Sequence, residues 1–88
     1  MKVSFKALPV RDTLKGQAKL SDLTQVVAEA VYQNAANFNE HKLAHRIAES
    51  DGELELNDIE VDAVRRSLVY HKFYIQKPIL EALGDKFE

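Results

Sequence analysis

The chain has 88 residues, of which 45% are hydrophobic and 30% are charged, and its formal net charge is −2. This length predicts one domain over residues 1–88, and the composition excludes a chain that is disordered throughout. The absence of cysteine excludes a disulfide scaffold, a cysteine nucleophile and a thiolate zinc site.

The N-terminal segment is too short and too interrupted by Lys6 and Pro9 for a signal peptide. No apolar run approaches the roughly 18 residues of a membrane span. We therefore expect a cytoplasmic protein that does not bind membranes.

Residues 2–8 alternate between apolar and polar side chains, which predicts a half-buried strand that ends at Pro9. Residues 9–19 read as a loop, or as a hairpin whose second strand is weak. Residues 53–56 alternate leucine with glutamate and are predicted to pair with residues 2–8. Opposite charges on the two strands favour this pairing.

Two helices are predicted in the middle of the chain. Ser21 is a suitable N-cap for a helix over residues 22–36, whose leucine, valine and alanine residues form a core stripe. Asn39 is expected to cap a shorter helix over residues 40–49. The turn residues 50–52 follow it.

The longest uninterrupted helical pattern covers residues 57–76. Asn57 and Glu60 have the spacing of a capping box at its start. Pro78 either kinks this helix or begins a short new one, and Gly84 is a stop signal. The predicted fold is α+β and mostly α, with three main helices, a short C-terminal helical turn and a two-stranded element.

The long helical pattern is apolar on two sides. One face carries Val61, Val64, Leu68 and Ile75, and the roughly opposite face carries Ile59, Ala63, Val69, Tyr70 and Phe73. A helix that is apolar on two sides is either central to its domain or shared with a partner.

Aromatic and basic residues follow one another along the second face. They are Arg66, Tyr70, Phe73, Tyr74 and Lys77. Such residues are typical of protein interfaces and also of nucleic-acid surfaces, whereas a second layer of core is the structural alternative. We take these five as the candidate partner-binding residues.

A metal site is one alternative. His41 and His45 have the i, i+4 spacing that can place two imidazoles on one ion, but zinc normally has three or four protein ligands. Gly52 fits the glycine position of a calcium loop, but Ile47 then occupies the first ligand position. We therefore expect no metal and no other cofactor. The candidates for this alternative are His41, His45, Asp51, Glu53, Glu55 and Asp58.

A nucleic-acid-binding regulator is the second alternative. The connection over residues 50–56 is longer than the turn of a helix-turn-helix. The helix that would enter the groove begins with Asp58, Glu60 and Asp62, which repel phosphates. Both features argue against this class.

Catalysis finds no support, because no serine lies in a nucleophile elbow and the three glycines are too scattered for a phosphate loop. The segments KVSFKAL, VAEAVYQNA, LAHRIAESDGELELNDIE and PILEAL resemble, in their layout, small uncharacterised proteins of bacterial prophages and other mobile elements. The resemblance covers most of the chain and implies a non-enzymatic accessory or assembly role. We therefore expect a protein–protein interaction module that binds a protein partner or itself as a homodimer.

Overall fold

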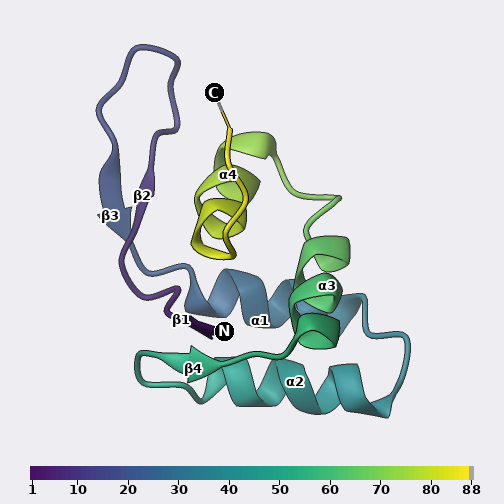
Figure 1. Cartoon of the computed structure of the whole chain (residues 1–88). Coiled ribbons are helices and arrows are strands. Elements are labelled where there is room, and N and C mark those ends of the chain that lie inside the picture. Colours follow the sequence, from purple (N-terminus) through teal and green to yellow (C-terminus); the bar gives the residue numbers. More distant parts are fainter. Residues whose placement is uncertain (88) are drawn as a thin grey trace.

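The structure, a computed structural model, describes residues 1–87, and within them it has four helices and two small antiparallel sheets (Figure 1). The helices are α1 (Thr24–Gln33), α2 (Phe38–Ala48), α3 (Asp58–Ser67) and α4 (Phe73–Ala82). The strands are β1 (Lys2–Val3), β2 (Leu8–Val10), β3 (Lys19–Ser21) and β4 (Leu54–Glu55). The expected mostly helical α+β class is confirmed.

The predicted pairing between the N-terminal strand and residues 53–56 is confirmed, but only over two residues of each strand. Lys2 lies opposite Glu55, and Val3 lies opposite Leu54. Beyond Val3 the chain leaves β4, and the carbonyl of the buried Phe5 instead accepts a hydrogen bond from the Leu23 N–H at 2.8 Å. A single strand over residues 2–8 was therefore wrong.

A second two-stranded sheet is a hairpin made by β2 and β3, with Leu8 opposite Ser21 and Val10 opposite Lys19. This confirms the hairpin interpretation of residues 9–19. The hairpin extends beyond the helices (Figure 1) and carries two strongly exposed leucines, Leu14 and Leu20.

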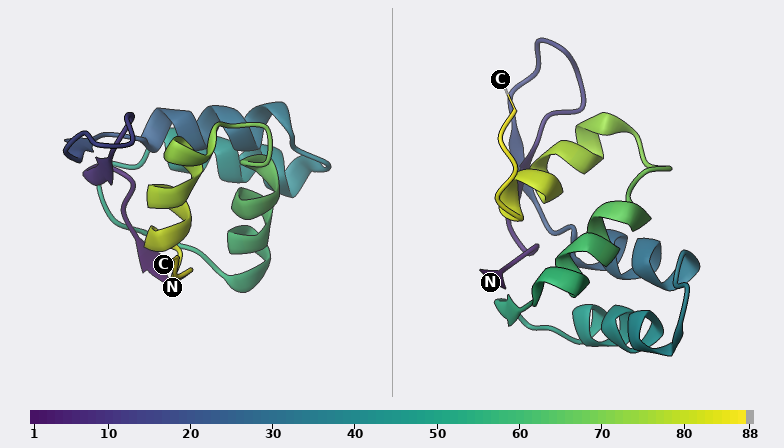
Figure 2. Two further views of the ribbon diagram at one scale, coloured as in Figure 1. Left: turned by 90° about the horizontal axis from the view of Figure 1, so that it is seen from above. Right: turned by 45° about the vertical axis from the view of Figure 1, so that its right-hand side comes forward.

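Helices α1 and α2 pack against each other, as Figures 1 and 2 show, and bury Val27, Val31, Leu43 and Ile47 between them and the rest of the core. Helix α2 begins two residues earlier than predicted. Asn37, and not Asn39, is its N-cap, because the Asn37 side chain accepts the Glu40 N–H at 3.0 Å.

The single helix predicted over residues 57–76 was wrong, because the chain forms α3 and α4 with a break between Ser67 and Phe73. The predicted capping box of Asn57 and Glu60 is confirmed at the start of α3. At its end, the Ser67 hydroxyl donates to the Ala63 carbonyl at 2.7 Å and competes with the backbone there. The predicted C-terminal turn is instead the ten-residue α4, which carries Pro78 in its interior.

The break explains how the two-sided apolar pattern is accommodated. Leu68 and Ile79 are both fully buried, and the break lets α3 pack against α1 while α4 packs against β2. Ala63 is also buried, whereas Ile59 and Tyr70 are left about four-fifths exposed. The prediction of a second apolar face on one helix was therefore only partly correct. Its exposed residues lie on different segments, with Ile59 on α3 and Tyr70 in the connection after α3.

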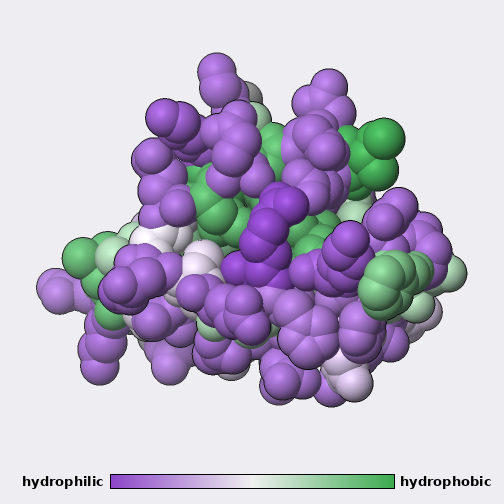
Figure 3. Space-filling model, turned by 90° about the horizontal axis from the view of Figure 1, so that it is seen from below, coloured by the Kyte–Doolittle hydropathy of each residue, from purple (hydrophilic) through white to green (hydrophobic). Residues whose placement is uncertain are grey.

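One hydrophobic core joins β1, β2 and β4, the connections and the four helices. Its buried members are Val3, Phe5, Leu8, Leu23, Val27, Ala28, Ala30, Val31, Leu43, Ala44, Ile47, Leu54, Leu56, Val61, Ala63, Val64, Leu68, Ile79 and Leu83. Seen from below, the surface is mostly hydrophilic with separate apolar areas (Figure 3). Each helix found in residues 1–87 is too short to cross a lipid bilayer.

Candidate functional site

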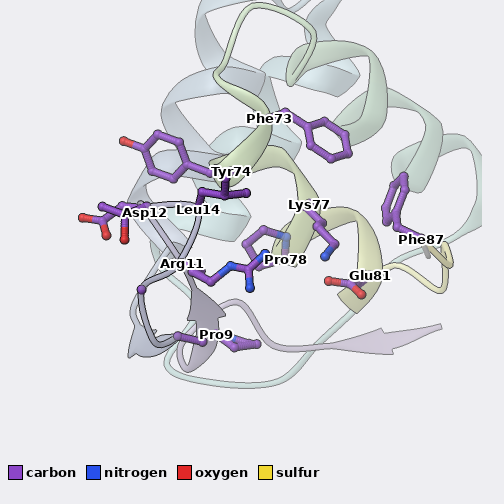
Figure 4. A pocket seen from close by; sticks show the side chains of 13 residues that line it. Pro9, Arg11, Asp12, Leu14, Phe73, Tyr74, Lys77, Pro78, Glu81 and Phe87 are labelled. Atoms are coloured by element: carbon purple, nitrogen blue, oxygen red, sulfur yellow. The ribbon is translucent and has the colours of Figure 1, made fainter.

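A groove with a volume of about 740 Å³ lies between the β2–β3 hairpin and α4 (Figure 4). Its size is within the range of about 300–1,000 Å³ that is usual for binding pockets. The large apolar and aromatic side chains that line it are Pro9, Leu14, Phe73, Tyr74, Pro78 and Phe87.

The α4 wall follows directly from the helix period. Ile79 and Leu83 point into the core and are at most 2% exposed, so the opposite side of α4 must face outward. Phe73, Lys77 and Glu81 follow one another at i, i+4 and i+8 and therefore share a face that lines the groove.

The aromatic end of the groove is held by a ring pair. The rings of Phe73 and Phe87 lie 5.4 Å apart between centroids and are nearly perpendicular, which is a favourable edge-to-face arrangement. Phe73 remains 54% exposed in spite of this contact. The aromatic surface thus has a defined ring contact but is not covered.

Four charged side chains line the groove, with one cation and one carboxylate on each wall. Arg11 and Asp12 come from the hairpin, and Lys77 and Glu81 come from α4 (Figure 4). None of the four takes part in an ion pair with another of the residues 1–87. Their charges are therefore available to a molecule that enters the groove.

Three of the five predicted partner-binding residues, Phe73, Tyr74 and Lys77, line this groove together. The other two lie elsewhere. Arg66 is on α3 and forms an ion pair with Glu40 of α2. Tyr70 is in the connection between α3 and α4, where it is 84% exposed and does not line the groove.

Sequence reasoning missed the hairpin wall of the groove. Arg11 and Leu14 are separated from the start of α4 at Phe73 by about sixty residues, and no local pattern links the two segments. The available signal was Leu14 itself, an apolar residue in a polar turn, which is 84% exposed in the structure.

Two ion pairs fix α3 on α2 and explain two acidic pKa values. Glu40 accepts the Ala36 N–H at 2.9 Å and also pairs with Arg66, and these contacts hold the pKa of Glu40 below its usual value. Burial alone would raise the pKa of Glu60. The hydrogen bonds from Arg46, at 2.9 Å, and from the Asn57 N–H outweigh this effect, so that the pKa of Glu60 is also lowered.

These lowered pKa values predict acid-sensitive stability. A carboxyl group whose pKa is lower in the folded state stabilises the fold above its unfolded pKa, near 4.3 for glutamate, and this contribution disappears as the pH falls through the folded pKa. We expect Glu60→Gln to lower the free energy of unfolding at pH 7 by up to about 1 kcal/mol, because it removes the ion pair with Arg46 while the Gln amide oxygen still accepts the Asn57 N–H.

Urea unfolding of wild type and Glu60→Gln at pH 7 and at successively lower pH measures this difference, which should shrink towards zero in acid. Glu53→Gln is the matched control, because Glu53 is exposed and makes no ion pair with another of the residues 1–87. A difference between wild type and Glu60→Gln that grows on acidification would contradict the account.

The metal candidates are mostly dispersed. Asp51 pairs with Lys6 at 3.4 Å, and Glu55 pairs with the N-terminal ammonium at 3.3 Å. No group of three or more histidine, aspartate or glutamate side chains that could hold an ion occurs in the described part of the chain. Only His41 and His45 come together, with their Nε2 atoms 3.2 Å apart.

Neither the start of α3 nor the groove offers a predominantly basic surface to a nucleic acid. Asp58 and Asp62 are exposed on the first half of α3, so that this end of the helix is acidic. Phosphates would be repelled there. The basic residues of the groove are matched by an equal number of carboxylates.

Comparison with known protein families, curated proteins and solved structures found no significant match to this chain. The assignment of function accordingly depends on the groove and on the side chains around it.

Proposed function

We propose that this protein is a non-enzymatic interaction module that associates with a second copy of itself through the groove between the β2–β3 hairpin and α4. The observation that carries the proposal is the combination of uncovered aromatic rings with four charges that have no ion-pair partner in residues 1–87. A self-association role of this kind agrees with the accessory or assembly role implied by the resemblance to prophage proteins.

A second copy is the occupant that the charges favour. A two-fold dimer uses the same patch on both subunits, so the patch must be complementary to itself. The groove carries Arg11 and Lys77 together with Asp12 and Glu81, and each cation can therefore face a carboxylate across the axis. A strongly basic or acidic partner would instead leave half of these charges opposite a like charge.

The apolar side chains supply the expected binding energy. Few residues dominate a typical interface, and large aromatic side chains near its centre are the usual ones. Phe73 and Tyr74, which line the groove, are 54% and 40% exposed, and Leu14 lies on the facing hairpin. Covering them would remove apolar surface from water at about 25 cal/mol per Å².

Sedimentation velocity tests this proposal. At about 100 µM, above the micromolar dissociation constants of weak interfaces, we expect wild type to sediment as a dimer. We expect Leu14→Asp to sediment as a monomer, because it places a charge in the apolar contact. Leu14 is 84% exposed, so this change should leave the fold intact.

Ile59→Asp is the matched control, because Ile59 is 79% exposed on α3 and does not line the groove. It should leave the dimer unchanged. A wild-type monomer at this concentration would contradict the proposal. A dimer that is lost in Ile59→Asp or Tyr70→Ser but kept in Leu14→Asp would place the interface elsewhere and also overturn it.

A further inference from the structure

The paired histidines on α2 form a second feature, which does not depend on the groove. His41 and His45 are one helical turn apart, and their Nε2 atoms approach to 3.2 Å. Neighbouring ligand nitrogens on a metal ion, each about 2.0–2.1 Å from it, are separated by about 2.9–3.4 Å in square or tetrahedral geometry. The two nitrogens are thus already at the separation that one bound ion requires.

We propose that His41 and His45 form an open two-ligand site for a divalent transition-metal ion of the copper type. Without the ion, the two Nε2 atoms lie at hydrogen-bonding distance from each other. On binding, each ring carries its proton on Nδ1 and offers the Nε2 lone pair to the ion. The remaining coordination positions are filled by water.

The neighbouring rings hold the two imidazoles in place. Tyr32 of α1 packs against both, with centroid distances of 5.1 Å to His41 and 6.0 Å to His45. The Phe38 ring stacks on His41 at 6.3 Å with an interplanar angle of 16°. Because these contacts restrict the ring orientations, less conformational freedom is lost when an ion binds.

Access and local charge also suit a cation. His45 is exposed and His41 is half-buried, so that an ion can reach both rings from solvent. Glu29 of α1 lines the same shallow hollow as Tyr32 and His45, where its carboxylate attracts a positive ion. Lys42 is the nearby opposing charge, with its ammonium placed over the Phe38 ring.

The ligand chemistry determines which ions should bind. Imidazole nitrogen suits copper, nickel and zinc, and affinity for a given site normally increases towards Cu²⁺ and falls again at Zn²⁺. Ca²⁺ and Mg²⁺ prefer oxygen ligands and should not bind here. The chain has no cysteine and only one further histidine, His71, so that few other side chains compete.

Titration of the full chain with Cu²⁺, Ni²⁺, Zn²⁺ or Ca²⁺, followed by calorimetry and by histidine NMR signals, tests the site. We expect one Cu²⁺ per chain on this pair, weaker binding of Ni²⁺ and Zn²⁺, and no binding of Ca²⁺. His41→Ala and His45→Ala should each weaken Cu²⁺ binding at least about tenfold, because the second ligand no longer acts at high effective concentration.

Two matched variants test whether Cu²⁺ binding requires this pair of histidines or depends only on the number of histidines in the chain. The double variant Lys42→His/His45→Ala keeps three histidines but places the pair at i, i+1, where the rings do not face each other. It should bind Cu²⁺ as weakly as His45→Ala does. His71→Gln should bind like wild type. Circular dichroism of each variant checks that it is folded. Cu²⁺ affinity that is unchanged in the folded His41→Ala protein, or that is lost in folded His71→Gln, would overturn the proposal.

Discussion

Replacement of Phe5 by alanine is expected to remove about 3–5 kcal/mol from the free energy of unfolding, the usual cost of emptying a buried aromatic site. Phe5 is 1% exposed, and it is among the largest fully buried side chains of the domain. It fills the core at the point where the chain passes from β1 to β2, and its carbonyl holds the start of α1 through the Leu23 N–H.

A domain of this size is expected to have a total stability near the lower end of the usual 5–15 kcal/mol, so that Phe5→Ala should remove half of it or more. Urea unfolding followed by circular dichroism measures the loss. Phe38→Ala is the matched control, because Phe38 is 71% exposed and its replacement should change stability by about 0.5 kcal/mol or less. Equal losses in the two variants would show that the assignment of the core is wrong.

The second large effect concerns the charges of the groove. The double variant Asp12→Lys/Glu81→Lys leaves only cations there, and Arg11→Glu/Lys77→Glu leaves only anions. Each variant alone should be a monomer, with self-association weakened at least about 100-fold, because like charges across an interface cost several kcal/mol. An equal mixture of the two variants should form a heterodimer.

This mixing experiment does not depend on which cation faces which carboxylate, because every cross-contact in the mixture joins opposite charges. Sedimentation velocity of each variant and of the mixture gives the result directly. Raising the salt concentration should weaken the heterodimer, because exposed charges are screened. A mixture that remains monomeric, or single variants that dimerise like wild type, would contradict the proposed self-complementary surface.

The sequence predicted local features well where a residue type strongly favours one local structure. The capping box of Asn57 and Glu60 and the stop at Gly84 follow from short-range chemistry. The pairing of β1 with β4 joins distant segments, and it was predicted from their alternating apolar residues and opposite charges. Gly84 has a φ of 100°, a conformation that other residues rarely adopt.

The break between α3 and α4 could not be predicted in this way, because it depends on tertiary packing. Residues 57–76 contain no Gly or Pro, and their helical pattern is continuous. The chain turns between Ser67 and Phe73, so that α3 packs against α1 while α4 packs against β2, with Leu68 and Ile79 both buried. Burial of these side chains outweighs the few backbone hydrogen bonds that the helix loses at the break.

The sequence predicted only the α4 wall of the candidate site. Phe73, Tyr74 and Lys77 were recognised by residue type and helical spacing, and they do share the groove. The interpretation of Arg66 and Tyr70 as their neighbours assumed one continuous helix, and the break separates these two residues from the groove. The hairpin wall comes from the other end of the sequence, and only the folded chain brings it to α4.

We propose that two copies meet at the groove between the hairpin and α4. Amide and aromatic NMR signals recorded over a dilution series report on this contact residue by residue. We predict that the signals that change with concentration are those of Leu14, Phe73, Tyr74 and Lys77, whereas those of Ile59 and Tyr70 stay constant. Constant signals in the groove, or changes confined to the region of Ile59 and Tyr70, would contradict it.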